Sequence, residues 1–264
     1  MKSLWARTSE ARGMILVLVA TVLVWEAAVI FLKPQPIILP APSRIWQELV
    51  ATPWYFLRHA GYTLGTTVVG FALSVVIGVG LAVGIVYSTL LERTIYTLLV
   101  ALNSLPKVAL APLFVIWMGT GMEPKVAIAV MLAIFSIVVD TVLGLRSVDP
   151  DALALAKVNR ASPLAVLMKI RFPNALPSLF AGMKVAVSFA LVGAIVGEFV
   201  ASDRGLGFVI LVAQGQFDTP RVFAALVVLG LMGTILFYLV DFVERLALPW
   251  HVSHRAVSAA RGPA

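Results

Sequence analysis

The sequence contains no cysteine and carries little charge: only 12% of its 264 residues are Asp, Glu, Lys or Arg, whereas soluble domains carry about 25%. The absence of cysteine excludes disulfides, thiolate metal sites and a cysteine nucleophile. The shortage of charge, beside 61% hydrophobic residues, leaves too little polar material to cover a water-facing surface. It also argues against a disordered chain and against a nucleic-acid-binding domain, although the net charge is +7. The composition therefore indicates an all-α polytopic membrane protein.

Catalytic motifs are missing as well. The chain has no P-loop sequence ending in Gly-Lys-Ser or Gly-Lys-Thr, no HExxH motif and no GxSxG motif. Its three histidines, His59, His251 and His254, fall outside the apolar segments, so no histidine-based catalytic group converges within the membrane. We therefore predict no enzyme activity, no catalytic residues, no metal site and no cofactor.

Six apolar segments are long enough to cross a membrane, since a helical span needs about 20 mostly apolar residues. Within one domain covering 1–264, we place them at about 14–32, 66–90, 95–117, 126–145, 183–201 and 222–246. Basic residues before the first segment also fit a signal peptide, but the run is long and no small-residue cleavage site follows, so we interpret it as a retained anchor. Gly80 and Gly84 form a GxxxG pair, which predicts close helix packing.

Lysine and arginine are distributed unequally between the loops. With the N-terminus inside, thirteen of them fall on the cytoplasmic side and six on the outer side, with Lys107 set aside. Because cytoplasmic loops carry the excess of positive charge, we predict that both termini lie in the cytoplasm. The protein is then a multi-pass component of the cell (inner) membrane.

The segment from Asp149 to Pro173 is the longest stretch between spans and contains two helix starts. Asp149 is placed to cap a helix that begins at Pro150, and Ser162 is placed to cap a second one that Pro173 ends. Both helices carry apolar residues that neither can bury alone. The hairpin therefore either dips into the membrane surface or docks a partner protein.

Charged residues inside the apolar segments are costly and mark either a pathway or an internal pair. Glu26, Asp140 and Asp241 lie near span ends, where structural roles are favoured. Glu198 lies near the outer end of the fifth segment, where it fits an outer gate or a receptor contact. Lys107 is the deepest, between Pro106 and Pro112, and either lines a translocation path or pairs with a carboxylate or backbone carbonyls.

Four collinear segments, spread over about residues 15–250, carry a family resemblance. Beside the hairpin they are the stretches 39–46 (LPAPSRIW), 106–119 (PKVALAPLFVIWMG) and 197–207 (GEFVASDRGLG). Together they resemble the permeases of binding-protein-dependent ABC importers, in particular the sulfonate, nitrate, taurine and pyrimidine-precursor branch. The family's coupling loop usually carries Glu-Ala-Ala, three residues and then Gly. Here those positions read Ala154-Leu155-Ala156 and Arg160, so a contact through the usual Glu is not carried over.

The resemblance implies a permease subunit that moves a small solute into the cytoplasm, powered by separate ABC ATPase subunits that bind the ATP. It implies an extracytoplasmic solute-binding protein and a second permease subunit, as a homodimer, within the lipid bilayer, and no nucleic acid. The hairpin 149–173 would dock the ATPase through Ala154, Leu155, Ala156, Arg160, Ala161 and Ser162, and the translocation path would include Lys107 and Glu198.

The solute class implied by this branch is a pyrimidine- or riboflavin-precursor-like or aromatic compound, or a sulfonate-, nitrate- or taurine-like anion. The alternative function is an ion-gradient-driven secondary transporter. Such a protein is expected to show inverted repeats and a cluster of intramembrane carboxylates, whereas the acidic residues here are scattered and no repeat is visible.

Overall fold

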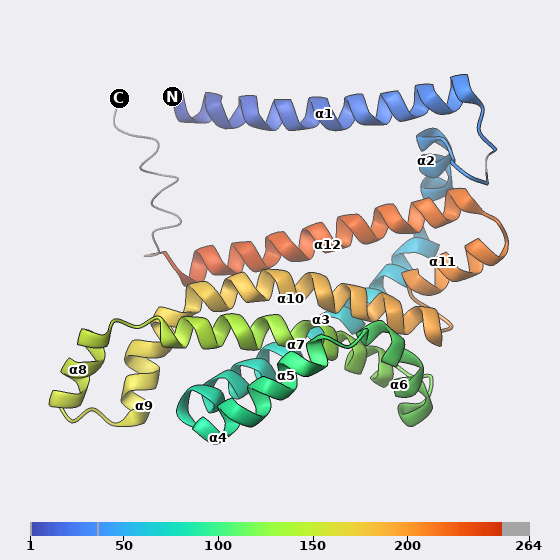
Figure 1. Ribbon diagram of the computed structural model, residues 1–264. Helices are drawn as coiled ribbons and strands as arrows, with labels where there is room; N and C mark the ends of the chain where they lie inside the picture. Colours follow the sequence, from blue (N-terminus) through green and yellow to red (C-terminus); the bar gives the residue numbers. More distant parts are fainter. Residues whose placement is uncertain (1, 36, 250–264) are drawn as a thin grey trace.

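The structure is a computed structural model that describes residues 2–35 and 37–249; the predicted cytoplasmic tail beyond residue 249, with His251 and His254, lies outside them. All regular structure in these two ranges is helical, as predicted (Figure 1). Short π-helical segments at Glu92–Tyr96 and Leu167–Arg171 and a 3-10 turn at Lys107–Leu110 interrupt the α-helices. The α-helices are α1 (Lys2–Leu32), α2 (Pro42–Ala51), α3 (Pro53–Tyr87), α4 (Thr89–Leu91), α5 (Thr97–Asn103), α6 (Ala111–Met118), α7 (Glu123–Arg146), α8 (Pro150–Val158), α9 (Pro163–Val166), α10 (Phe172–Val200), α11 (Leu206–Gly215) and α12 (Thr219–Ala247).

Four helices are long and apolar enough to cross a membrane: α3, α7, the continuous helix 163–200 that contains α10, and α12. They contain most of the second, fourth, fifth and sixth predicted spans, and the first lies within α1. The third predicted span, 95–117, is broken: the pieces Thr89–Asn103 and Lys107–Met118 meet at 93°. The break falls at Pro106, which has no backbone donor and crowds the preceding turn, as expected for proline inside a helix.

Helices α3 and α10 both pack against α7 and contact each other, and a glycine on each allows the close approach to α7. A Cβ built at Gly70 of α3 would lie 2.5 Å from Ala129 Cβ, and one built at Gly193 of α10 would lie 2.5 Å from Ala129 Cα. Ala129 is fully buried between them. Small residues let helix backbones approach closely in lipid, so these contacts define the centre of the bundle.

The GxxxG pair does not supply these contacts, which corrects the prediction made for it. Gly80 has no neighbouring atom within 4 Å of an added Cβ, and Gly84 meets only the side chain of Leu91 within the same distance. The face of α3 that packs on α7 instead passes through Gly70 and Gly78. Spacing alone identifies glycines that share a helix face, but the partner helix determines which face is buried.

Pro173 does not end the second helix of the hairpin, contrary to the prediction. The helix continues from Pro163 to Val200, and Pro173 lies two residues after the end of the π-helical segment Leu167–Arg171. Regular i→i−4 bonding is already interrupted there, so the missing N–H of proline is tolerated.

The two ends of the bundle differ in what they present (Figure 1). The hairpin of α8 and α9 extends from the end where α7 finishes and α10 begins, on the left of the view, together with the last turns of α12. The first turns of α3, the 201–205 loop and α11 lie at the opposite end. The predicted topology places the first of these ends in the cytoplasm and the second outside.

Candidate functional site

The coupling hairpin, residues 149–173, begins with the predicted caps. Asp149 Oδ1 accepts a hydrogen bond from Asp151 N at 2.8 Å, and Ser162 Oγ accepts one from Ala165 N at 3.2 Å. Side chains at its base attach it to the bundle, because Arg171 Nη1 donates to Leu145 O at 2.7 Å. The hairpin is therefore a projecting structure with a fixed base, made of the short helix α8 and the first turns of the long helix Pro163–Val200.

The turn between the two helices closes around Arg160. Its φ is +52°, the left-handed conformation that glycine adopts most easily. The amide of Ala161 donates to Ala156 O and the amide of Arg160 donates to Lys157 O, both at 3.0 Å. These two bonds form a Schellman C-cap, in which the left-handed residue is usually glycine. The family resemblance aligns the usual glycine of the loop with this position, which arginine occupies here at a conformational cost.

The hairpin leaves a row of large apolar side chains uncovered by the rest of the chain. Ala156 is buried, whereas Leu155, Val158, Leu164 and Met168 are 64%, 80%, 67% and 58% exposed. Among the predicted docking residues, Leu155 and Arg160 are exposed and Ala156 is buried. Exposed apolar side chains of this kind fit both predicted surroundings of the hairpin, the membrane surface and a partner protein.

At the opposite end, Glu198 is enclosed in a polar cluster. Its side chain accepts a hydrogen bond from Thr63 Oγ1 at 2.8 Å and one from Gly207 N at 2.7 Å, and the residue is 2% exposed. Leu206 N donates to Thr63 Oγ1 at 2.8 Å, and Gly205 N donates to His59 Nδ1 at 3.0 Å. We call Glu198, Thr63, His59 and residues 205–207 the outer cluster, after the predicted topology.

Gly205 is required in the outer cluster for two independent reasons. Its φ is +104°, a conformation that side chains rarely adopt, and a Cβ added to it would collide with the carboxylate of Glu198. The 201–205 loop therefore closes directly over the buried acid. The sequence placed Glu198 near this loop but did not identify Thr63 or His59, which are more than 130 residues away in the chain.

Lys125, which the sequence placed in an outer loop, is fully buried at the start of α7. Its Nζ donates to the carbonyl oxygens of Thr120 and Gly121 at 3.1 and 2.9 Å and to the Tyr62 hydroxyl at 3.3 Å. Its stem lies against Gly197, the residue before Glu198. Lys125 thus links α7 to the outer cluster, a role that no sequence motif indicates.

Lys107 lies at the break of the third predicted span. Its Nζ donates to Asn103 Oδ1 at 2.7 Å and lies 5.6 Å from the centroid of the Phe135 ring. Within residues 2–35 and 37–249, Lys107 forms no ion pair. A cavity of about 290 Å³ beside it, the Lys107 pocket, is also lined by Ser136 and Phe189. A cation, an amide, a hydroxyl and two aromatic rings therefore converge at the break.

Two other charged residues of the predicted spans, Asp241 and Glu26, have structural partners. Lys184 of α10 forms ion pairs with Asp241 and Glu244 of α12, both at 2.5 Å, and so joins the two helices. Glu26 of α1 accepts hydrogen bonds from the amide and the hydroxyl of Ser43 at 3.0 and 2.8 Å. These contacts support structural roles for Asp241 and Glu26.

The chain is similar in sequence to known membrane transport proteins. Residues 74–248 match the family described as "Binding-protein-dependent transport system inner membrane component". The formylaminopyrimidine transport permease protein of Halalkalibacterium halodurans is 34% identical over 245 residues, which cover 92% of this chain and 98% of that protein. The riboflavin transport system permease protein of Chloroflexus aurantiacus is 34% identical over 247 residues, covering 92% and 91%.

A solved structure shares the fold. A chain of the methionine ABC transporter MetNI, in an inward-facing conformation, superposes with a TM-score of 0.67 at 18% sequence identity. The match covers 75% of this chain and 98% of that one. This chain and that one therefore share the helical fold described above.

Proposed function

The chain belongs to the family of binding-protein-dependent transport system inner membrane components, and we propose that its ATPase subunits bind the coupling hairpin, residues 149–173. Members of this family are permease subunits of ATP-driven importers, and the chain is such a subunit in a cell membrane. The family works with ATPase subunits and a solute-binding protein. The proposal concerns where and how these partners meet this chain.

The uncovered apolar row of the hairpin carries this proposal. Leu155 and Val158 project from a helix whose ends are capped and whose base is attached to the bundle. A rigid apolar projection is suited to insertion into a groove of an ATPase, and movement of that ATPase would then be transmitted to the helices. Arg160 adds a positive charge at the tip of this surface.

Substitution of Leu155 tests the docking site. Leu155→Asp would bury an unpaired carboxylate in the interface, so we expect normal membrane insertion with loss of ATPase co-purification and of solute uptake. Lys157→Asp is the matched control, because it places a carboxylate on the opposite face of the same helix. Undiminished co-purification of the Leu155→Asp variant would contradict the proposal.

For the solute, we propose a planar nitrogen heterocycle rather than a sulfonate, nitrate or taurine. The two relatives at 34% identity are named for formylaminopyrimidine and riboflavin. The Lys107 pocket supports this class, since Phe135 and Phe189 offer aromatic surfaces and Lys107 and Asn103 offer hydrogen bonds. We propose that Lys107 faces the translocation path and that Glu198 supports the path by holding the 201–205 loop closed.

Lys107→Met tests the path assignment, because it retains most of the side-chain length and removes the charge. We expect lower uptake with unchanged protein yield, whereas Lys33→Met, at an exposed position after α1, should leave uptake unchanged. Full uptake by the Lys107→Met variant would contradict the assignment.

Finally, we propose a homodimer of permeases, which predicts that two differently tagged copies of this chain co-purify with each other.

A further inference from the structure

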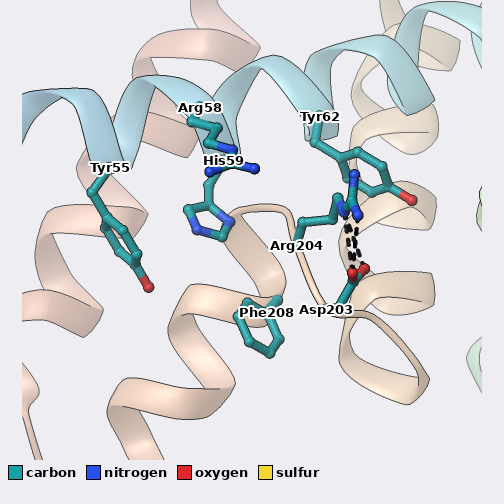
Figure 2. A pocket seen from close by; sticks show the side chains of 7 residues that line it. All are labelled: Tyr55, Arg58, His59, Tyr62, Asp203, Arg204 and Phe208. Atoms are coloured by element: carbon teal, nitrogen blue, oxygen red, sulfur yellow. Dashed lines mark hydrogen bonds and ion pairs between the residues drawn. The ribbon is translucent and has the colours of Figure 1, made fainter.

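A second cavity lies at the end of the bundle opposite the hairpin, between the first turns of α3 and the segment 203–208. Its volume is about 460 Å³, within the range of about 300–1,000 Å³ typical of small-molecule sites. Figure 2 shows the side chains that line this outer pocket: Tyr55, Arg58, His59, Tyr62, Asp203, Arg204 and Phe208. The outer pocket and the Lys107 pocket share no lining residue.

One wall of the outer pocket is aromatic. The rings of Tyr55 and His59 have centroids 4.5 Å apart, and the rings of His59 and Phe208 stack at 5.9 Å with an interplanar angle of 23°. Figure 2 shows these three rings on one side of the pocket. Aromatic side chains offer large faces against which a planar ring of a ligand can pack.

The other wall is polar and rich in donors. Arg204 Nε lies 3.2 and 3.3 Å from the carboxylate oxygens of Asp203, which holds the pKa of Asp203 below its ordinary value. Tyr62 accepts a hydrogen bond from Lys125, and in the described part of the chain its own hydroxyl proton has no acceptor. Arg58 adds a second guanidinium group. Two guanidinium groups beside one carboxylate leave a net positive charge and several free N–H donors.

The outer cluster holds the two walls together. His59 Nδ1 accepts from Gly205 N, so the neutral ring carries its proton on Nε2. Thr63 lies one turn further along α3. Its hydroxyl accepts a hydrogen bond from the amide of Leu206 and donates one to the buried carboxylate of Glu198. The aromatic and polar walls are thus joined by buried hydrogen bonds rather than by exposed loops alone, which is the support that a preorganised binding site requires.

We propose that the outer pocket binds a planar heterocycle with an acceptor-rich edge at the outer end of the permease. The ring lies against His59 and Phe208, and its carbonyl, carboxylate or phosphate oxygens accept from Arg204, Arg58 and the Tyr62 hydroxyl. Binding here places the solute on the permease before it reaches the Lys107 pocket. This inference rests on the proposed function, because it takes the solute class from it.

Equilibrium binding in the absence of the solute-binding protein tests the outer pocket. The permease–ATPase complex is placed in nanodiscs, and binding of riboflavin and of formylaminopyrimidine is measured by fluorescence quenching and calorimetry. We expect one of them to bind, and Arg204→Gln to weaken its Kd about tenfold or more, the effect of losing a charge-assisted hydrogen bond. Arg58→Gln, at an exposed position, provides a second variant. Arg44→Gln, on α2 and outside the pocket, is the matched control.

The outcomes separate this inference from the proposed function. If wild-type protein with its binding protein takes up neither compound, both the solute class and the outer pocket are wrong. If a compound is taken up but does not bind the complex alone, or binds Arg204→Gln and Arg58→Gln as tightly as wild type, only the outer pocket is wrong. Weaker binding of the solute-binding protein with unchanged solute affinity would show a receptor contact and would also overturn the inference.

Discussion

The outer cluster and the coupling hairpin are opposite kinds of structure within one chain. In the outer cluster, charged and polar groups are buried and joined by hydrogen bonds, so that Glu198 at 2% exposure is bonded to two partners. In the hairpin, large apolar side chains such as Val158 at 80% exposure have no cover from the rest of the chain. The first arrangement is complete within a single chain, whereas the second leaves an apolar surface that the ATPase covers in the proposed function.

This contrast predicts that the two regions have different roles: the outer cluster stabilises the fold, and the hairpin couples the permease to its ATPase. A buried polar network is costly to disrupt because each group that loses its partner remains away from water. An exposed apolar surface contributes little to the stability of the chain that carries it. We therefore expect substitutions in the outer cluster to unfold the protein and substitutions on the hairpin to disconnect it from its ATPase.

The largest effect is expected from Gly205→Ala. The added methyl group meets the Glu198 carboxylate and the backbone must retain φ near +104°, so we expect a loss of about 2–4 kcal/mol in stability, measured by thermal unfolding in detergent. Gly215→Ala is the control, because no atom lies within 4 Å of its added Cβ. Equal melting temperatures for the two variants would contradict the described closure of the loop.

A smaller loss is expected from Glu198→Gln, which keeps the shape and replaces one acceptor oxygen with an amide NH2 group, a donor. Gly207 N and Thr63 Oγ1 each donate to the carboxylate, so one buried donor is left unpaired or must rearrange. The expected cost is about 1–3 kcal/mol by thermal unfolding. Glu123→Gln, at an exposed position of α7, should leave the melting temperature unchanged.

Arg160→Gly should stabilise the hairpin by about 1 kcal/mol, because glycine adopts the left-handed conformation without the side-chain penalty. Hydrogen exchange at the Ala161 amide, which closes the Schellman cap, reports this locally and should slow about fivefold. Lys157→Gly is the control and should have the opposite sign, since it introduces glycine inside α8. Faster exchange in Arg160→Gly would show that the turn is not strained.

The smallest change in stability is expected from Leu155→Asp in the isolated permease. Leu155 is 64% exposed, so its substitution should alter unfolding by no more than about 0.5 kcal/mol, although it should abolish ATPase binding. Thermal unfolding of the permease without its ATPase provides the measurement. A loss comparable to that of Glu198→Gln would mean that the hairpin is part of the folded core.

Local chemistry made much of the fold predictable. The apolar segments, and the caps at Asp149 and Ser162, depend on residues within one or two helical turns. Contacts between distant segments were not predictable in this way. The burial of Lys125 depends on carbonyls of the preceding turn and on Tyr62, 63 residues earlier.

The outer pocket shows the same limit. Tyr55, Arg58, His59 and Tyr62 recur at the helical spacing i, i+3, i+4 and i+7, which places them on one face of α3. That spacing is enough to predict one wall of a pocket from the sequence. It does not reveal that residues 203–208 form the opposite wall. For Pro173, the sequence offered a helix stop, whereas the preceding π-helical segment allows the helix to continue.

Cysteine labelling on this cysteine-free chain tests the central claim most directly, namely that one end of the bundle binds the ATPase and the other faces outward. Single cysteines are introduced at Val158, in the hairpin, and at the exposed Gln216, which follows α11. An impermeant maleimide should label Gln216→Cys in intact cells, and should label Val158→Cys only in inverted vesicles stripped of ATPase, with protection when ATPase is added back. Labelling of Val158→Cys in intact cells, or equal labelling with and without the ATPase, would contradict the account.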